Sequence, residues 1–147
     1  SCTYGPRQFG TEDQGWVAHF IISSALGRRL TIYGDGKQTR DVLYIDDLIK
    51  ALDLALRKSD KTKGKVYNIG GGRVNTISLL ELVAYIEKLL NRKIDYSFAE
   101  WRPGDQKVYV SDIRKATEDF GWAPQVRKEE GIKKLLNWVT ANRELFE

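Results

Sequence analysis

The sequence predicts an α/β fold, and three observations support this prediction. Short apolar stretches of four or five residues alternate along the chain with longer stretches that have helical periodicity. Signals for turns and helix ends, built on Gly, Asp and Pro, separate these stretches. With 147 residues the chain is also long enough to bury a core of its own. Alternating strands and helices are typical of α/β proteins.

The amino-terminal part predicts one helix and two short strands. Residues 15–26 are apolar almost all round at helical spacing and stop at Gly27, which indicates a largely buried helix with a glycine C-cap. Residues 30–33 and 42–45 have the pattern of short strands. The Asp-Gly pair at 35–36 predicts a tight turn between them.

A second helix is predicted directly after the strand at 42–45. Asp46 or Asp47 can cap it, and it runs to about Lys58. Its apolar positions predict one inward face, which consists of Leu48, Ile49, Leu52, Ala55 and Leu56.

The second half of the chain repeats the alternation. A strand is predicted at 66–69, before Gly70-Gly71-Gly72, and Ser78 with Glu81 forms a capping box at the start of an amphipathic helix. The remaining predicted elements are strands at 94–98 and 107–110 and helices at 112–121 and 128–143.

Composition excludes several classes of protein. With 41% hydrophobic and 30% charged residues, the chain has the composition of an ordinary folded protein. The net charge of +4 is spread along the chain, so it favours a local anion pocket over a nucleic-acid arm. No stretch has the length of a membrane span.

The single cysteine, Cys2, excludes an internal disulfide and fits a reducing compartment, so we expect a cytoplasmic protein. The sequence has no Met and starts like the end of a strand, so we expect it to be a piece of a longer chain.

Two arginines carry the strongest chemical signal. Arg40 lies in Tyr-Gly-Asp-Gly-Lys-Gln-Thr-Arg-Asp and Arg102 in Trp-Arg-Pro-Gly-Asp, and each has an acid close behind it, Asp41 and Asp105. A guanidinium binds two phosphate oxygens at once, so two such groups brought together by folding would suit a diphosphate. Two ordinary surface ion pairs are the other interpretation of the same residues.

Other candidate sites are weaker. Gly70–Gly72 lacks the spacing of a dinucleotide loop, and a flexible turn is the preferred interpretation. His19 has no cysteine or second histidine near it, so we expect no metal site. Cys2 has no evident activating base. Tyr33 and Trp101 could stack on a base, but aromatic residues at strand ends are more often part of the core.

A series of motifs nevertheless spans nearly the whole chain in order. The motifs are Tyr-Gly-Pro-Arg-Gln (4–8), Tyr-Gly-Asp-Gly-x-Gln-x-Arg-Asp (33–41), Tyr-Ile-Asp-Asp-Leu (44–48), Asn-Ile-Gly (68–70), Arg-Pro-Gly-Asp (102–105), Ser-Asp (111–112) and Phe-Gly-Trp-x-Pro (120–124). Together they resemble the carboxy-terminal half of the extended short-chain dehydrogenase/reductase family, the NAD-dependent nucleotide-sugar epimerases and dehydratases, and residues 7–16 resemble the CDP-paratose 2-epimerase branch most.

The resemblance implies roles for particular residues. Arg40 and Arg102 match the arginines that hold the substrate diphosphate, Asp105 an acid that binds the ribose, and Tyr33 lies where the family flanks the base. The residues expected near the nicotinamide of NAD are Ser1, Cys2 and Tyr4. Many relatives have asparagine at the position of Cys2.

The resemblance also implies an organisation. Residues 1–14 and 41–70 would be the last elements of a Rossmann-type NAD-binding fold, and residues 15–40 and 71–147 would mainly form the small α/β substrate-binding domain. The dinucleotide loop, the catalytic Ser or Thr and the Tyr-Lys pair would precede Ser1, so we expect no catalytic residue in this chain.

The expected ligand is a nucleotide-diphosphate sugar and the intact enzyme is expected to be a homodimer, with no nucleic-acid or membrane partner. A UDP-glucose 4-epimerase, a sugar dehydratase and a module that only binds nucleotides or RNA remain alternatives.

Overall fold

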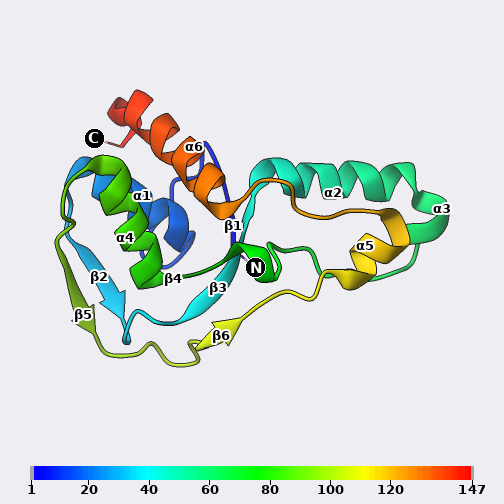
Figure 1. Cartoon of the computed structure of the whole chain (residues 1–147), viewed down its shortest axis with the longest axis horizontal. Helices are drawn as coiled ribbons and strands as arrows, with labels where there is room; N and C mark the ends of the chain where they lie inside the picture. Colours follow the sequence, from blue (N-terminus) through cyan, green and yellow to red (C-terminus); the bar gives the residue numbers. More distant parts are fainter. Residues whose placement is uncertain (1, 147) are drawn as a thin grey trace.

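The computed structural model describes residues 2–146, so the prediction for Ser1 lies outside the described residues. Figure 1 shows two regions on either side of strands β1 (Cys2–Tyr4) and β3 (Thr39–Tyr44). We call the first region the pocket lobe; it contains α1 (Trp16–Leu26), β2 (Leu30–Tyr33), α4 (Leu79–Leu90), β5 (Tyr96–Ala99) and α6 (Lys128–Ala141). We call the second the helical arm; it contains α2 (Ile45–Arg57), α3 (Ser59–Thr62) and α5 (Arg114–Phe120). The alternation of helices and strands confirms the predicted α/β class.

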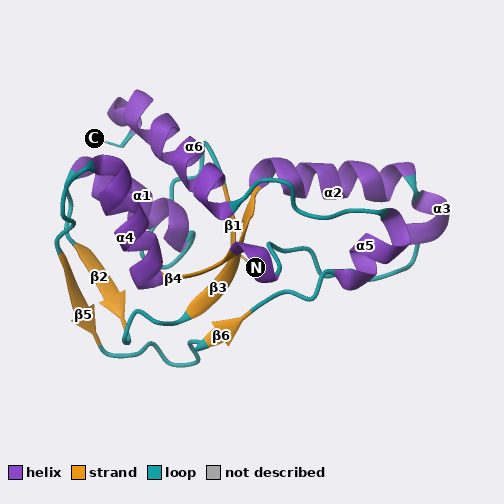
Figure 2. Ribbon diagram, in the orientation of Figure 1, coloured by secondary structure: helices purple, strands orange, loops and turns teal. Residues whose placement is uncertain are grey.

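Strand β3 lies between the two regions and contacts α6 of the pocket lobe and α2 of the helical arm (Figure 2). Its two halves pair with different strands. Its second half pairs in parallel with β1, while its first half lies between β4 (Thr76–Ser78), antiparallel, and β6 (Val108–Tyr109), parallel. In this register Arg40 is opposite Ile77 on one side and Tyr109 on the other. Strand β2 instead pairs in parallel with β5 in a separate sheet. The Asp-Gly turn at 35–36 therefore connects two sheets.

The pocket lobe holds the main hydrophobic core. Helix α1 is buried along most of its length, as its apolar sequence predicts, and Gly27 caps it in the left-handed conformation at φ 73°. Helix α6 packs against α1 through the predicted apolar stripe, which includes Ile132, Leu135 and Val139. These three side chains are fully buried.

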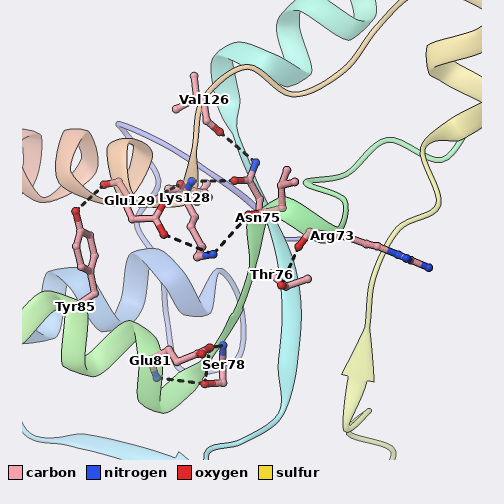
Figure 3. Close-up of polar contacts among 11 residues, drawn as sticks. Arg73, Asn75, Thr76, Ser78, Glu81, Tyr85, Val126, Lys128 and Glu129 are labelled. Atoms are coloured by element: carbon pink, nitrogen blue, oxygen red, sulfur yellow. Dashed lines mark hydrogen bonds and ion pairs between the residues drawn. The ribbon is translucent and has the colours of Figure 1, made fainter.

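Asn75, in the short 3-10 turn Arg73–Asn75, ties the start of α6 to the strand before α4 (Figure 3). Its buried amide donates to the carbonyl oxygen of Val126 at 3.2 Å and accepts from the N–H of Lys128 at 2.9 Å. Figure 3 also shows the predicted capping box, in which Ser78 and Glu81 exchange hydrogen bonds and begin α4. A second 3-10 turn, Arg143–Leu145, follows α6.

Helix α2 differs from the prediction in its start and its inward face. It begins at Ile45, so Asp46 and Asp47 lie in its first turn and do not cap it. Ile49, Leu52 and Leu56 are 57%, 60% and 75% exposed, so the prediction that they face inward is wrong. The inward face is instead formed by Ala51, with Leu48, Leu54 and Ala55 beside it, against Phe120 and Trp122.

Buried Asp47 explains how the arm is oriented. Its Oδ2 accepts the backbone N–H groups of Gln125 and Val126 at 2.9 and 2.8 Å, and Lys50 lies 3.6 Å from its Oδ1. The indole N–H of Trp122 donates to the carbonyl oxygen of Asp47 at 2.9 Å. A fully buried carboxylate needs such partners, and here they attach the chain that leads into α6 to the start of α2.

Two predictions for residues 66–72 are also corrected. Residues 66–69 form no strand, although their side chains alternate, because the described residues offer no neighbouring strand; Val66 is 82% exposed. Gly70–Gly72 is buried, so the interpretation as a flexible turn is wrong. A Cβ at Gly71 would collide with the carbonyl oxygen of Val42, which explains the need for glycine at this close approach.

Candidate functional site

A cavity of about 350 Å³ opens where the pocket lobe meets the first half of β3. The loop before α1, the face of α1, strand β2 and the Arg-Pro-Gly-Asp loop contribute its walls. The lining residues are Glu12, Asp13, Gln14, Gly15, Trp16, His19, Phe20, Thr31, Tyr33, Gln38, Arg40, Leu79, Arg102, Pro103, Gly104 and Asp105. All four residues that the resemblance implies for the substrate, Tyr33, Arg40, Arg102 and Asp105, therefore line one cavity.

Arg40 reaches this cavity from β3, where neighbouring strands hold its backbone on both sides. Its guanidinium donates to Asp105 Oδ1 at 2.7 Å, and both side chains are largely shielded, with 18% and 26% exposed. The acid that follows each arginine in the sequence is not its partner in the structure: Arg40 pairs with Asp105, and Arg102 lies near Glu12 and Asp13. Asp41 is buried and accepts the N–H of Gly72 at 3.1 Å, while Asp105 pairs with the distant Arg40.

Arg102 lies over the ring of Tyr33, with its guanidinium carbon 3.9 Å from the ring centre. It donates to the carbonyl oxygen of Glu12 at 3.1 Å, and the carboxylates of Glu12 and Asp13 lie 3.9 and 3.4 Å away. The hydroxyl of Tyr33 donates to Glu12 at 2.7 Å. Arg102 thus covers one face of Tyr33.

Trp101 does not line this cavity, although it precedes Arg102 in the sequence. Its ring packs over Gly34, where a Cβ would collide with the indole, and Gly34 has a left-handed φ of 79°. Trp101 therefore fixes the turn after β2 and does not offer a stacking surface in the cavity.

A second cavity of about 390 Å³ adjoins the first one at Arg40 and at residues 13–16. Its other lining residues are Cys2, Gln106 and Tyr109. Burial raises the pKa of the Cys2 thiol to about 11, so the thiol is neutral at pH 7 and is a poor nucleophile.

Tyr4 does not reach either cavity. Its side chain is 2% exposed, packs edge-on against Tyr44, and donates to the carbonyl oxygen of Lys128 at 3.3 Å. The Tyr4 side chain therefore belongs to the core of the pocket lobe. Of the three residues expected near NAD, only Cys2 is both described and open to a cavity.

Sequence reasoning missed several lining residues. For His19 the sequence analysis assigned no role beyond the expectation of no metal site, but the residue lies half-buried in the cavity wall. Burial lowers its pKa, so the imidazole is neutral at pH 7. Glu12 and Asp13 were not singled out either; two adjacent acids directly before a buried helix are the signal that could have found them.

The described residues show neither a candidate metal centre nor a membrane-spanning helix. Residues 2–146 contain no group of three or more His, Cys, Asp or Glu side chains that could hold a metal ion. Within the same range, none of the helices is long and apolar enough to cross a membrane.

Comparison with known proteins identifies the family. Residues 1–135 match the GDP-mannose 4,6 dehydratase family. CDP-paratose 2-epimerase of Salmonella typhi is 40% identical over 146 residues, which cover 96% of this chain and 43% of that protein. The chain therefore spans less than half the length of this relative.

Solved structures agree with this result. The UDP-glucose 4-epimerase of Thermotoga maritima, solved with UDP-glucose, superimposes with a TM-score of 0.85 at 32% identity over 99% of this chain and 44% of that one. The UDP-glucuronic acid 4-epimerase of Bacillus cereus, solved with UDP-glucuronic acid and NAD, gives a TM-score of 0.83 at 33% identity over 95% and 43%. The chain belongs to the GDP-mannose 4,6 dehydratase family, within the nucleotide-sugar epimerases and dehydratases of the extended short-chain dehydrogenase/reductase type.

Proposed function

We propose that this chain is the substrate-binding half of an NAD-dependent nucleotide-sugar epimerase, and that the whole enzyme is a CDP-paratose 2-epimerase. The observation that carries the proposal is the placement of Arg40 and Arg102, 62 positions apart in the sequence, in the wall of one cavity. The identity of 40% to the Salmonella typhi enzyme favours a CDP-linked sugar as substrate.

In the proposed complex the two guanidinium groups bind the diphosphate, because planar N–H donors match the oxygens of phosphate groups. Asp105, already bonded to Arg40, accepts from a ribose hydroxyl. The base lies beside Tyr33 and the guanidinium of Arg102 stacked on it. The sugar then extends toward the second cavity, in which Cys2 offers a neutral thiol at the position where many relatives have asparagine.

NAD is proposed as the cofactor of the whole enzyme. The structure of the UDP-glucuronic acid 4-epimerase of Bacillus cereus contains NAD. The sequence has no glycine-rich dinucleotide loop, and of the residues expected near NAD the buried Tyr4 lines neither cavity whereas Cys2 lines the second one. We therefore assign this chain the positioning of the substrate and assign no hydride-transfer or proton-transfer step to its residues.

Calorimetric titration of the chain with CDP and with UDP tests the proposal. Wild type is expected to bind one nucleotide, and Arg40→Ala or Arg102→Ala is expected to lose roughly 1.5–3 kcal/mol of binding free energy, as for a removed charged hydrogen-bond partner. Arg114→Ala is a matched control because Arg114 is an exposed arginine of the helical arm that pairs with Asp112. Unchanged affinity in both cavity variants would contradict the diphosphate site.

The same titration separates the alternatives. Tighter binding of UDP than of CDP would favour a UDP-glucose 4-epimerase or a dehydratase, and an assay of the intact enzyme with each sugar nucleotide would decide between these two. A module for RNA should instead show affinity that falls steeply with salt and depends little on sequence.

A further inference from the structure

The charges in the wall of the first cavity do not suit a diphosphate as they stand. Two guanidinium groups, Arg40 and Arg102, face three carboxylates, Glu12, Asp13 and Asp105. His19 is neutral at pH 7 because burial lowers its pKa, so it adds no positive charge. A diphosphate that enters this arrangement meets more negative than positive charge. Some of these carboxylates must therefore give way for tight binding.

The three acids differ in how firmly they are held. Asp105 is 26% exposed and bonds to Arg40 at 2.7 Å, so it is part of the cavity wall. Glu12 and Asp13 are 45% and 92% exposed and lie 3.9 and 3.4 Å from the guanidinium of Arg102. Ion pairs as exposed as these are weak, so a ligand phosphate can replace them at small cost.

Glu12 and Asp13 belong to a small closed unit, which we call the acidic turn, residues Thr11–Gln14. The backbone of Thr11 and Gln14 exchanges two hydrogen bonds, at 2.8 and 3.3 Å. A glycine lies on each side, and Gly15 has a left-handed φ of 73° that closes the turn just before α1. The backbone carbonyl of Glu12 also accepts from Arg102, so the turn contacts this arginine with both main chain and side chains.

We propose that the acidic turn acts as an intramolecular competitor for Arg102, which occupies the guanidinium until a ligand phosphate displaces it. This inference rests on the proposed function and extends it to the regulation of the same site. The turn keeps Arg102 over the ring of Tyr33 through the bond from the Tyr33 hydroxyl to Glu12. Entry of a diphosphate breaks the contacts to both carboxylates and frees the N–H groups of Arg102 for phosphate oxygens.

The test is the double variant Glu12→Gln and Asp13→Asn, titrated with CDP at low salt. Glutamine keeps an acceptor for the Tyr33 hydroxyl, so the fold of the turn is maintained. Loss of the competing charges should tighten CDP binding by about two- to tenfold, the range expected for two exposed ion pairs. Glu100→Gln is the control, because Glu100 is exposed and lies outside the cavity lining; it should leave the affinity for CDP unchanged.

The Arg102→Ala background distinguishes competition from simple repulsion. If the acids act through Arg102, the same double substitution should change CDP affinity by less than about twofold once Arg102 is absent. An equal gain with and without Arg102, or weaker CDP binding in the double variant, would overturn the inference. Failure of wild type and of the double variant to bind CDP or UDP would contradict the proposed function itself, and the competitor with it.

Discussion

Helices α1 and α2 are both rich in apolar residues, yet the structure buries them very differently. Elements of the pocket lobe, α4, α6 and β2, surround α1 together with β1, and most of its side chains are inaccessible. Helix α2 packs its Ala51 face on a small cluster around Phe120 and Trp122, and it leaves Leu52 and Leu56 largely exposed. Apolar content therefore shows which residues favour burial, whereas the neighbours present decide which are buried.

The largest expected effect comes from breaking the core of the helical arm. Trp122→Ala removes a fully buried indole and its bond to the carbonyl of Asp47, which should cost about 3–5 kcal/mol of unfolding free energy. Urea denaturation measures this loss. Hydrogen exchange should show that α2 and α5 lose protection first, while α4 and α6 keep theirs.

Trp101→Ala is the matched control because Trp101 is 38% exposed. Its replacement should lower the free energy of unfolding by less than about 1 kcal/mol. Equal loss of protection in α6 and α2 would show that the two regions unfold as one unit, contrary to the comparison.

A smaller effect is expected from the ion pair in the cavity wall. A double-mutant cycle with Arg40→Gln and Asp105→Asn should give a coupling energy of about 0.5–1 kcal/mol in urea denaturation. The arm offers a matched pair, Lys65 with Asp119 at 3.0 Å, whose lysine is 46% exposed. Its coupling should lie below about 0.5 kcal/mol because water screens the charges. Equal coupling energies for the two pairs would contradict the predicted difference between the cavity wall and the helical arm.

The exposed stripe of α2 is expected to matter more for association than for stability. Replacing Ile49, Leu52 and Leu56 with Gln should change unfolding free energy by about 0.5 kcal/mol or less per site. Light scattering should show that wild type associates and that the triple variant does so less, because contiguous apolar surface favours contact between molecules.

The control for this experiment replaces three exposed apolar residues of other elements, Val74, Phe98 and Leu145, with Gln. It should leave association as in wild type. A wild-type chain that remains a compact, very stable monomer at high concentration would contradict the prediction.

The smallest expected effect is the pH dependence that His19 contributes. Its pKa is lowered in the folded chain from 6.5 by burial, so the unfolded chain takes up the proton first as pH falls. The free energy of unfolding should therefore fall as the pH drops from 6.5 to the lower pKa of folded His19. Above pH 6.5, His19 should contribute no pH dependence. Urea midpoints at pH 7.5 and 5.5 should differ less in His19→Asn than in wild type. Equal differences would refute this assignment, because His19 is the single histidine of the sequence.

Much of the fold follows from local sequence. The caps at Gly27 and Ser78 and the apolar helix at 15–26 are confirmed because neighbouring residues alone create these signals. The strand predicted at 66–69 is wrong because a strand requires a partner, which no local pattern supplies. Leu52 and Leu56 are exposed for a similar reason: burial requires a neighbouring element, and no local pattern supplies one.

The candidate site divides in a similar way. The sequence identified Tyr33, Arg40, Arg102 and Asp105 by their motifs, and these residues line one cavity. It did not predict that Asp105 would pair with Arg40, or that the acidic turn would lie against Arg102.

By itself the sequence determined the α/β class, the helix caps and the residue types suited to a diphosphate, because propensity, periodicity and functional-group chemistry act over a few neighbouring positions. Tertiary structure alone decided which acid neutralises which arginine and which apolar faces are covered. Both depend on distances between segments far apart along the chain, and only the packing of β3 against its neighbours and of α1 against the lobe sets those distances.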